Sequence, residues 1–223
     1  MQVAENPKVT KLITNHLIDM YHLVDRREGI HISSLIGCLT RSFFDTSEGK
    51  IDPTPEELQL FALGYALQDV ITPKKALTPL IQLEGITYRP DFTIKMTKTD
   101  FYEIKTTRMS QNKGDNFDFP EAWLEYMKGG CFMSNRNDYD LAVWFLMGNY
   151  KPPFPTIKGY HFTFDDDELN DNWDYITQRK FIYESCLADG TPPAPYKWNK
   201  EYECKNCRYK LVCDTLSMRN LGR

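Results

Sequence analysis

A run of three cysteines close to the end of the sequence constrains this chain more than any other feature. In ECKNCRYKLVC (203–213), Cys204, Cys207 and Cys213 follow a Cys-x2-Cys-x5-Cys spacing. Thiols at such spacing are typical of ligands for zinc or for an iron–sulphur cluster. A closed tetrahedral site needs four ligands, so a fourth thiol is expected from elsewhere in the chain. We expect it to be Cys38, in SSLIGCLTRSFFD.

The rest of the composition is that of an ordinary globular chain. It has 223 residues, of which 41% are hydrophobic and 26% charged, enough to bury a core. No run of eighteen apolar residues could span a membrane, and the start, MQVAENPKVTKL, has no apolar signal core. We therefore predict a cytoplasmic protein, of a prokaryotic cell or a virus-infected host, with no membrane partner and with cysteines that are reduced or metal-bound. The net charge of −4 argues against a general nucleic-acid coat but permits a local basic groove.

Hydrophobic periodicity and turn signals predict helices that alternate with strands. Helices are predicted over 8–25, 53–71, 119–133 and 165–190, and a further helix, capped by Ser33 or Ser34, is predicted to contain Cys38. A β-hairpin is predicted over 85–108 with its turn near Thr97 to Asp100, a strand buried on both faces within 139–148, and another strand over 157–164. The acids at 165–168 indicate a helix start rather than a metal site.

These elements predict a single α/β domain, 1–223, with a central mixed sheet flanked by helices. We expect an N-terminal helical segment (1–50) that carries Cys38, a core (51–190) and a C-terminal cysteine clasp (191–223).

A pair of carboxylates lies within the predicted hairpin. Asp91 follows Pro90 on the first strand, and Glu103-Ile104-Lys105 lies on the second. Residues i and i+2 of a strand share a face, so Glu103 and Lys105 project together while Ile104 points away. The turn would bring Asp91 beside Glu103, where both could bind one Mg²⁺ or Mn²⁺, and Lys105 could stabilise developing charge on a phosphate. The simpler interpretation is an exposed Glu-x-Lys ion pair without a function.

Together, the early cysteine, the Pro-Asp…Glu-x-Lys hairpin and the terminal cysteine run resemble the RecB-like branch of the PD-(D/E)XK nucleases that carry an iron–sulphur cluster. The likeness is greatest to the CRISPR-associated RecB-like exonucleases and their phage-encoded relatives. It covers the chain from about Ser33 to Cys213. The resemblance implies a restriction-endonuclease-like core whose N- and C-terminal segments are clasped by a metal cluster.

The resemblance also implies roles for particular residues. Asp91, Glu103 and Lys105 would be catalytic; Asp91, Glu103 and the Ile104 carbonyl would bind Mg²⁺ or Mn²⁺. A [4Fe–4S] cluster would be bound by Cys38, Cys204, Cys207 and Cys213. Arg41 would be placed to meet a DNA phosphate. Spacing alone does not separate zinc from iron–sulphur, and we interpret Cys131 and Cys186 as buried or incidental.

The sequence departs from this family at two motifs. The family has Gly-x3-His before the hairpin, its histidine a metal ligand, where this chain has Gly64 and Gln68. A glutamine oxygen could ligate Mg²⁺, though more weakly than imidazole ligates Mn²⁺. The family also has Gln-x3-Tyr on the next helix, where this chain has Tyr126 and Gly130. Tyr126 is a candidate DNA contact, because aromatic rings can stack on bases.

Three functional hypotheses follow. The first is a metal-dependent DNA nuclease, an exonuclease acting on single strands or free ends in DNA processing, CRISPR adaptation or phage recombination. The second is a catalytically weak or inactive nuclease fold that binds DNA or docks on integration or other DNA-processing proteins. The third is a zinc-clasped α/β protein unrelated to nucleic acid.

Overall fold

The computed structural model describes residues 7–24, 29–47, 51–73, 79–95, 99–108, 118–146, 155–194, 204 and 207–221. The helices and strands in chain order are α1 (Pro7–Val24), β1 (Ile30–His31), α2 (Ile32–Ile36), α3 (Leu39–Ser47), α4 (Pro55–Ile71), β2 (Ile81–Leu83), β3 (Ile86–Tyr88), β4 (Phe92–Lys95), β5 (Thr99–Thr107), α5 (Glu121–Met133), β6 (Asp138–Phe145), β7 (Thr156–Thr163), α6 (Asp166–Asp189) and α8 (Lys210–Leu221).

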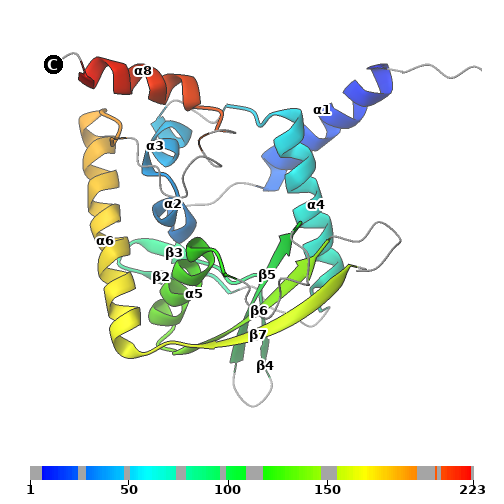
Figure 1. The fold of residues 1–223 in the computed structure, drawn as a ribbon, viewed down its shortest axis with the longest axis vertical. Coiled ribbons are helices and arrows are strands. Elements are labelled where there is room, and N and C mark those ends of the chain that lie inside the picture. The colour runs from blue at the N-terminus through cyan, green and yellow to red at the C-terminus, as the bar shows by residue number, and fades with distance from the viewer. Residues whose placement is uncertain are drawn as a thin grey trace, which may run out of the picture.

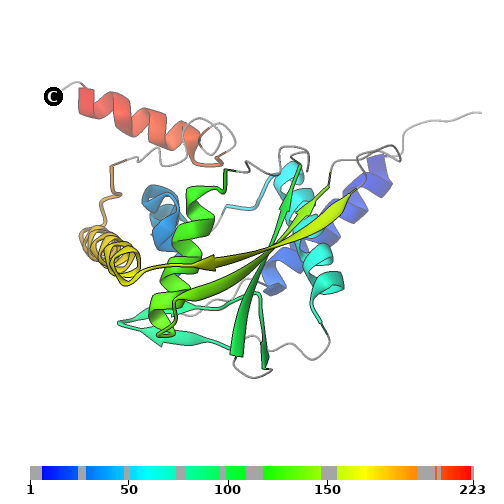
Figure 2. The ribbon, with the colours of Figure 1, turned by 60° about the horizontal axis from the view of Figure 1, so that its bottom comes forward.

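The larger sheet has four strands in the order β4-β5-β6-β7. β4 and β5 form an antiparallel hairpin, β5 and β6 are parallel, and β7 returns antiparallel to β6. A parallel pair needs a crossover, and α5 lies between β5 and β6 in the sequence. Figures 1 and 2 show α5 and α6 stacked on one side of this sheet, with α4 and α1 at the end toward which β5 runs. The expected α/β architecture with a mixed sheet flanked by helices is confirmed.

The predicted hairpin over 85–108 is correct only in its second half. β3 leaves the hairpin and joins a separate small sheet of order β1-β3-β2, parallel to β1 and antiparallel to β2. Glu84 and Gly85 form the turn between β2 and β3, and both have positive φ angles. Pro90 and Asp91 lie at the change of direction, so Asp91 precedes β4 rather than pairing within it. Of the predicted turn, Thr97 lies outside the described residues, and Thr99 and Asp100 are not in a turn but pair with β4 as the start of β5.

The prediction that the strand within 139–148 is buried on both faces is wrong. Along β6, Tyr139, Leu141, Val143 and Phe145 are buried, while the alternate residues are only half-buried. The strand is central in hydrogen bonding but packs against the core on one face only. In this strand, a near-continuous apolar sequence accompanies one fully buried and one half-buried face.

Two helices begin where the sequence predicts. Thr54 caps α4 and Asp165 caps α6, each through a reciprocal capping box with the glutamate three residues later. The acids at 165–168 thus form a helix start, as expected. Gly190 ends α6 in the left-handed conformation, which glycine adopts without a steric penalty.

The predicted helix through Cys38 is two helices. α2 ends at Ile36 and α3 begins at Leu39, so Cys38 lies in the break between them. The N-cap of α2 is His31, whose side chain accepts a hydrogen bond from the Ser33 backbone N–H, and not Ser33 or Ser34. Gly37 has an extended backbone and ends the first of these helices.

The N- and C-terminal parts of the chain meet where α3 contacts the turn that precedes α8 (Figure 1). Asp45 of α3 pairs with Arg208 at 3.0 Å and accepts a hydrogen bond from the Tyr209 hydroxyl at 2.7 Å. The Tyr209 side chain is buried and packs on Phe44, with 5.2 Å between ring centroids. This contact brings Cys38 and the terminal cysteines to the same end of the molecule. Within the described residues, no helix has the length and apolar character needed to cross a membrane.

Candidate functional site

The structure gathers the predicted acidic site at the junction of β4 and β5. Asp91 lies directly before β4, and Glu103, Ile104 and Lys105 lie on β5. Gln68 reaches the site from α4 and Tyr126 from α5. Residues separated by up to 58 positions in the sequence, from Gln68 to Tyr126, are therefore brought together by packing.

The Asp91 carboxylate lies at the edge of β5. One oxygen, Oδ2, accepts the backbone N–H of Ile104 at 2.6 Å, and Oδ1 accepts the side-chain amide of Gln68 at 2.9 Å. The β4 ladder ends with Phe92 opposite Tyr102, so the side chain of Asp91 supplies the acceptor that the strand no longer provides. Because the N–H and C=O of a strand residue point to the same edge, the Ile104 carbonyl points toward this edge as well.

Glu103 is a buried carboxylate, with only 3% of its surface exposed. Its Oε1 accepts a hydrogen bond from Lys105 Nζ, and its Oε2 lies 3.5 Å from the Tyr139 hydroxyl. Burial, and then the nearby charge of Asp91, raises the pKa of Glu103 to about 7, although Lys105 acts in the opposite direction. A carboxylate held in this way is costly to ionise unless a cation lies beside it.

Lys105 is the cation present in the chain itself. Burial opposes its charged form, but the charges of Glu103 and Asp91 outweigh that effect and raise the pKa of Lys105. Its Nζ lies 5.6 Å from the ring centroid of Tyr126, within the range of a cation–π interaction. About a quarter of the side chain, 27%, remains exposed, so Lys105 lies at the boundary between the buried carboxylates and solvent.

Tyr126 and Gly130 are one turn apart on α5. The Tyr126 hydroxyl donates to the carbonyl of Arg89 at 2.7 Å, which ties α5 to the segment before Asp91. Gly130 lies under the ring of Tyr88, where a Cβ atom would come within 2.4 Å of that ring. Gly130 stands where the family that the sequence resembles has a tyrosine, and the ring of Tyr88, from β3, fills the space beside it.

The residues of this site fit a divalent cation with oxygen ligands. Two carboxylates of like charge lie close enough for Asp91 to raise the pKa of Glu103, and a cation between them would relieve that repulsion. The Ile104 carbonyl points to the same edge. Gln68 directs its amide N–H at Asp91, so in this arrangement it orients the carboxylate, and its oxygen is the only part that could bind a metal.

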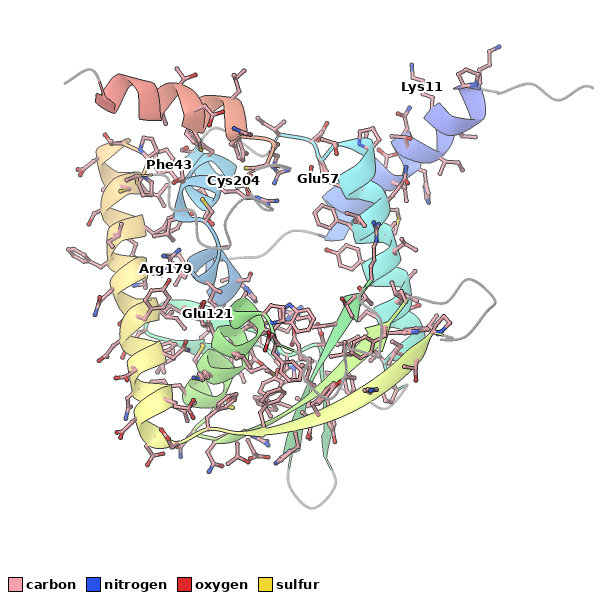
Figure 3. All side chains as sticks on the ribbon, viewed as in Figure 1. Lys11, Phe43, Glu57, Glu121, Arg179 and Cys204 are labelled. Atoms are coloured by element: carbon pink, nitrogen blue, oxygen red, sulfur yellow. The ribbon has the colours of Figure 1, made fainter. Side chains whose placement is uncertain are left out.

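The four expected cluster cysteines lie in one neighbourhood. Burial, together with the other three thiols, Cys38, Cys207 and Cys204, raises the pKa of Cys213 to about 11. The pKa of Cys207 is raised by burial, and Cys38 and Cys204 contribute. Figure 3 shows Cys204 beside α3, which follows Cys38. Cys131, by contrast, is fully buried, with its pKa raised to about 12 by burial.

The thiols do not converge into a closed ligand set. Across the part of the chain that the structure describes, no three His, Cys, Asp or Glu side chains are grouped as a metal centre requires. The chemistry of the donors still fits a soft metal, because four thiols from two distant segments face the same region. Thiolates that repel one another would be stabilised by a bound metal, which also lowers their pKa values.

Arg41, the expected phosphate contact, lies beside the cysteines. Its Nε is 3.9 Å from Asp45 Oδ2, and its charge lowers the pKa of Cys207. The side chain is 37% exposed. Arg41 therefore lies beside the cysteines and is partly open to solvent.

Three residues near these sites were not predicted from the sequence. Tyr139 and Tyr88 are fully buried, and their hydroxyls contact each other beneath Glu103. Arg179 of α6 is buried and donates to the carbonyls of Leu35 and Gly37, just before Cys38 (Figure 3). A charged residue facing the apolar side of a predicted helix was the one available signal for Arg179. For the tyrosines there was none, because aromatic residues in strands are common core residues.

The sequence matches no family model and no curated protein. Among solved structures, the crystal structure of SSO0001 is similar, with a TM-score of 0.54 and 16% identity over 92% of this chain and 96% of that chain. An alkaline exonuclease, LHK-Exo from Laribacter hongkongensis, gives a TM-score of 0.49 and 12% identity over 78% of this chain and 95% of its own. A phage-related exonuclease from Haemophilus somnus 129PT gives a TM-score of 0.44 and 15% identity over 77% of this chain and 100% of its own.

The likeness to SSO0001 extends over nearly the full length of both chains and shows a shared fold. The scores of the two exonucleases are too low to assign a fold to this chain, and identities at this level say nothing about its chemistry.

Proposed function

We propose that this chain is a metal-dependent DNA nuclease that hydrolyses phosphodiester bonds at single strands or free ends. The observation that supports this most directly is the arrangement of Asp91, Glu103 and Lys105. Glu103 is a buried carboxylate that accepts a hydrogen bond from Lys105, and a second carboxylate, Asp91, lies near it. A simple surface ion pair would be exposed, whereas Glu103 is 3% exposed.

Different residues would bind the metal, orient its ligands and stabilise charge on the phosphate. Asp91, Glu103 and the Ile104 carbonyl would hold Mg²⁺ or Mn²⁺, which supplies Lewis acidity toward a phosphate when bound. Asp91 is held in place by Ile104 N–H and by Gln68. Lys105 would stabilise negative charge that develops on the phosphate, since its side chain is partly exposed and the neighbouring carboxylates keep its ammonium protonated. Tyr126, whose ring lies under that ammonium, would help to fix its direction.

The test compares the wild type with Asp91→Asn, Glu103→Gln and Lys105→Met on end-labelled single-stranded and duplex DNA with Mn²⁺. Asp140→Asn is the matched control, because Asp140 also pairs with a neighbouring side chain, His161, but on the exposed side of β6. We expect each site variant to lose at least about 100-fold in rate, with the control unchanged. Cleavage that survives in Asp91→Asn and Glu103→Gln would reject the proposal.

A second function is favoured by one observation. Gln68 donates to Asp91 where an imidazole ligand would be needed for a complete site. A nuclease fold that binds DNA, or docks on integration or other DNA-processing proteins, with little cleavage would accommodate this substitution. Measurable DNA binding by fluorescence anisotropy, with no turnover in Mn²⁺ and no effect of Glu103→Gln on binding, would favour this function.

We also propose that Cys38, Cys204, Cys207 and Cys213 bind a [4Fe–4S] cluster, with zinc as the alternative occupant. The support is that four thiols from the two ends of the described chain influence one another's pKa values. Closing such a long loop would stabilise the fold chiefly by limiting the unfolded chain. Anaerobic purification followed by metal analysis separates the two: a brown protein with iron supports the cluster, and a colourless protein with one zinc supports the alternative.

A further inference from the structure

Two buried tyrosines lie directly behind Glu103. Tyr88 comes from β3 of the small sheet and Tyr139 from β6 of the large one, and neither has any exposed surface. Their hydroxyl groups are hydrogen-bonded to each other, and the Tyr139 hydroxyl lies 3.5 Å from Glu103 Oε2. The three polar groups form a line that ends on the oxygen of Glu103 opposite the one bound by Lys105.

The number of protons determines which group donates and which accepts along this hydrogen-bond chain. Each phenol has one proton to donate. If Tyr139 donates to Glu103, Tyr88 can donate to Tyr139, and both protons are used. This arrangement gives both buried donors an acceptor, and a buried donor without an acceptor destabilises the folded protein. Hydrogen bonds aligned in this way also strengthen one another.

The surrounding side chains keep both hydroxyls in place. The ring of Tyr88 lies on Gly130 and beside Tyr126, with 5.1 Å between the two ring centroids. Phe101 packs edge-on against Tyr139 at 6.1 Å and stacks near Tyr88 at 6.4 Å. Neither ring can turn its hydroxyl away from Glu103 without displacing α5 or β5.

We infer that Tyr139, oriented by Tyr88, is a positioning residue for Glu103. It holds Oε2 from behind and fixes the plane of the carboxylate, so that Oε1 is presented to Lys105 and to the cation site beside Asp91. Neither tyrosine reaches the exposed side of the site, so they act through Glu103 and do not touch a substrate. This inference rests on the proposed nuclease function for its catalytic consequence, but the hydrogen-bond chain can be tested without it.

The experiment uses Tyr139→Phe and Tyr88→Phe, which remove one hydroxyl each and keep the rings. Tyr183→Phe is the matched control: Tyr183 is 4% exposed, and its hydroxyl bonds to Thr46 and to the Ser42 carbonyl, far from Glu103. In the metal-free protein the ¹³C chemical shift of the Glu103 carboxyl is recorded. Mn²⁺ affinity is then measured by titration followed with electron paramagnetic resonance.

We expect Tyr139→Phe to move the Glu103 carboxyl signal and to weaken Mn²⁺ binding about 10-fold, the lower end of what loss of an orienting partner costs a metal site. Tyr88→Phe should show the same changes to a smaller degree. Tyr183→Phe should lower thermal stability only. In the cleavage assay, Tyr139→Phe should lower kcat and leave the KM for DNA unchanged.

The outcomes separate this inference from the proposed function. If Tyr139→Phe and Tyr183→Phe give the same carboxyl signal and the same Mn²⁺ affinity, Tyr139 does not position Glu103, while the nuclease proposal stands if the wild type cleaves DNA. If the carboxyl signal moves in Tyr139→Phe but the wild type binds no Mn²⁺, the positioning is upheld and the metal-dependent nuclease is rejected.

Discussion

The ring of Tyr88 lies on the backbone of Gly130, so closely that a Cβ atom there would be 2.4 Å from Tyr88 Cζ and 2.6 Å from its hydroxyl oxygen. Glycine inside a helix costs about 1 kcal/mol relative to alanine, and Gly130 is in the interior of α5. The close approach of Tyr88 explains why this position is a glycine. It also connects the small sheet to the helix that carries Tyr126.

Gly130→Ala should therefore destabilise the protein, although alanine is the better helix former. Tyr88 is fully buried, so its ring has nowhere to move, and overpacking of this kind costs about 1–3 kcal/mol. Gly64→Ala in α4 is the control, because nothing lies within 4 Å of a Cβ added there. It should be neutral or stabilise by up to about 1 kcal/mol. Urea unfolding of both variants checks the opposite signs; equal effects would show that Tyr88 does not fill this space.

Gln68→His should raise Mn²⁺ affinity and, if the site cleaves DNA, the rate of cleavage. Imidazole is a better ligand than an amide for a transition-metal ion such as Mn²⁺, and position 68 already reaches Asp91 at 2.9 Å. Gln68→Ala is the comparison, since it removes the amide that orients Asp91 without adding a ligand, and it should weaken binding. Calorimetric titration with Mn²⁺ gives both values. An identical loss in the two variants would mean that position 68 only orients Asp91.

Cys38→Ser should remove most of the metal from the purified protein and lower its thermal stability. Cys38 is the one cysteine of the proposed ligand set that lies far from the others in the sequence, so its loss opens the connection between the two ends of the chain. Cys186→Ser is the control, because Cys186 lies on α6 outside the set. Metal content per chain and the visible spectrum are the measurements. Full metal occupancy in Cys38→Ser would exclude it as a ligand.

Arg179→Met should destabilise the break between α2 and α3 that holds Cys38. The side chain is 7% exposed and donates to the carbonyls of Leu35 and Gly37. Leaving two buried carbonyls without donors costs about 2–6 kcal/mol at about 1–3 each. Lys180→Met is the control, since Lys180 makes a surface pair with Glu184 that is worth about 0–1 kcal/mol. Hydrogen exchange should speed up in residues 32–47 of the Arg179 variant alone; unchanged exchange there would contradict this role.

The metal-free protein should lose stability as the pH rises from about 4.5 to about 7. Burial, with Asp91, raises the pKa of Glu103 to about 7, and burial, with Glu121, raises that of Glu125 to about 7. A carboxyl whose pKa is higher in the folded state contributes stability that is complete below its ordinary pKa and disappears above the folded value. For Glu103 this is at most about 3 kcal/mol.

Thermal melts between pH 4 and pH 8 with a chelator measure this slope. Glu103→Gln and Glu125→Gln should each flatten it in part, and Glu168→Gln should not, because hydrogen bonding from Lys128 lowers the pKa of Glu168. Added Mn²⁺ should restore stability at the higher pH in the wild type and not in Glu103→Gln. A slope that stays unchanged in both glutamine variants would show that neither carboxyl titrates in this range.

Local signals in the sequence were sufficient for the regular elements. Pro55 with the glutamates after it, the acids at 165–168 and the stop at Gly190 predicted α4 and α6 almost to the residue. The capping boxes at Thr54–Glu57 and Asp165–Glu168 are equally local, since each joins residues within one turn. Alternation along one strand likewise placed Glu103 and Lys105 on one face. Such patterns depend on backbone geometry that neighbouring residues determine by themselves.

The tertiary structure decided everything that depends on partners distant in the chain. It assigned β3 to a second sheet with β1 and β2, broke the helix at Cys38, and left one face of β6 only half-buried. It also placed Tyr88, Tyr139 and Gln68 around Asp91 and Glu103. These contacts depend on how whole elements fill space against each other, and a side chain's burial and partners are set by that packing rather than by its neighbours in the sequence.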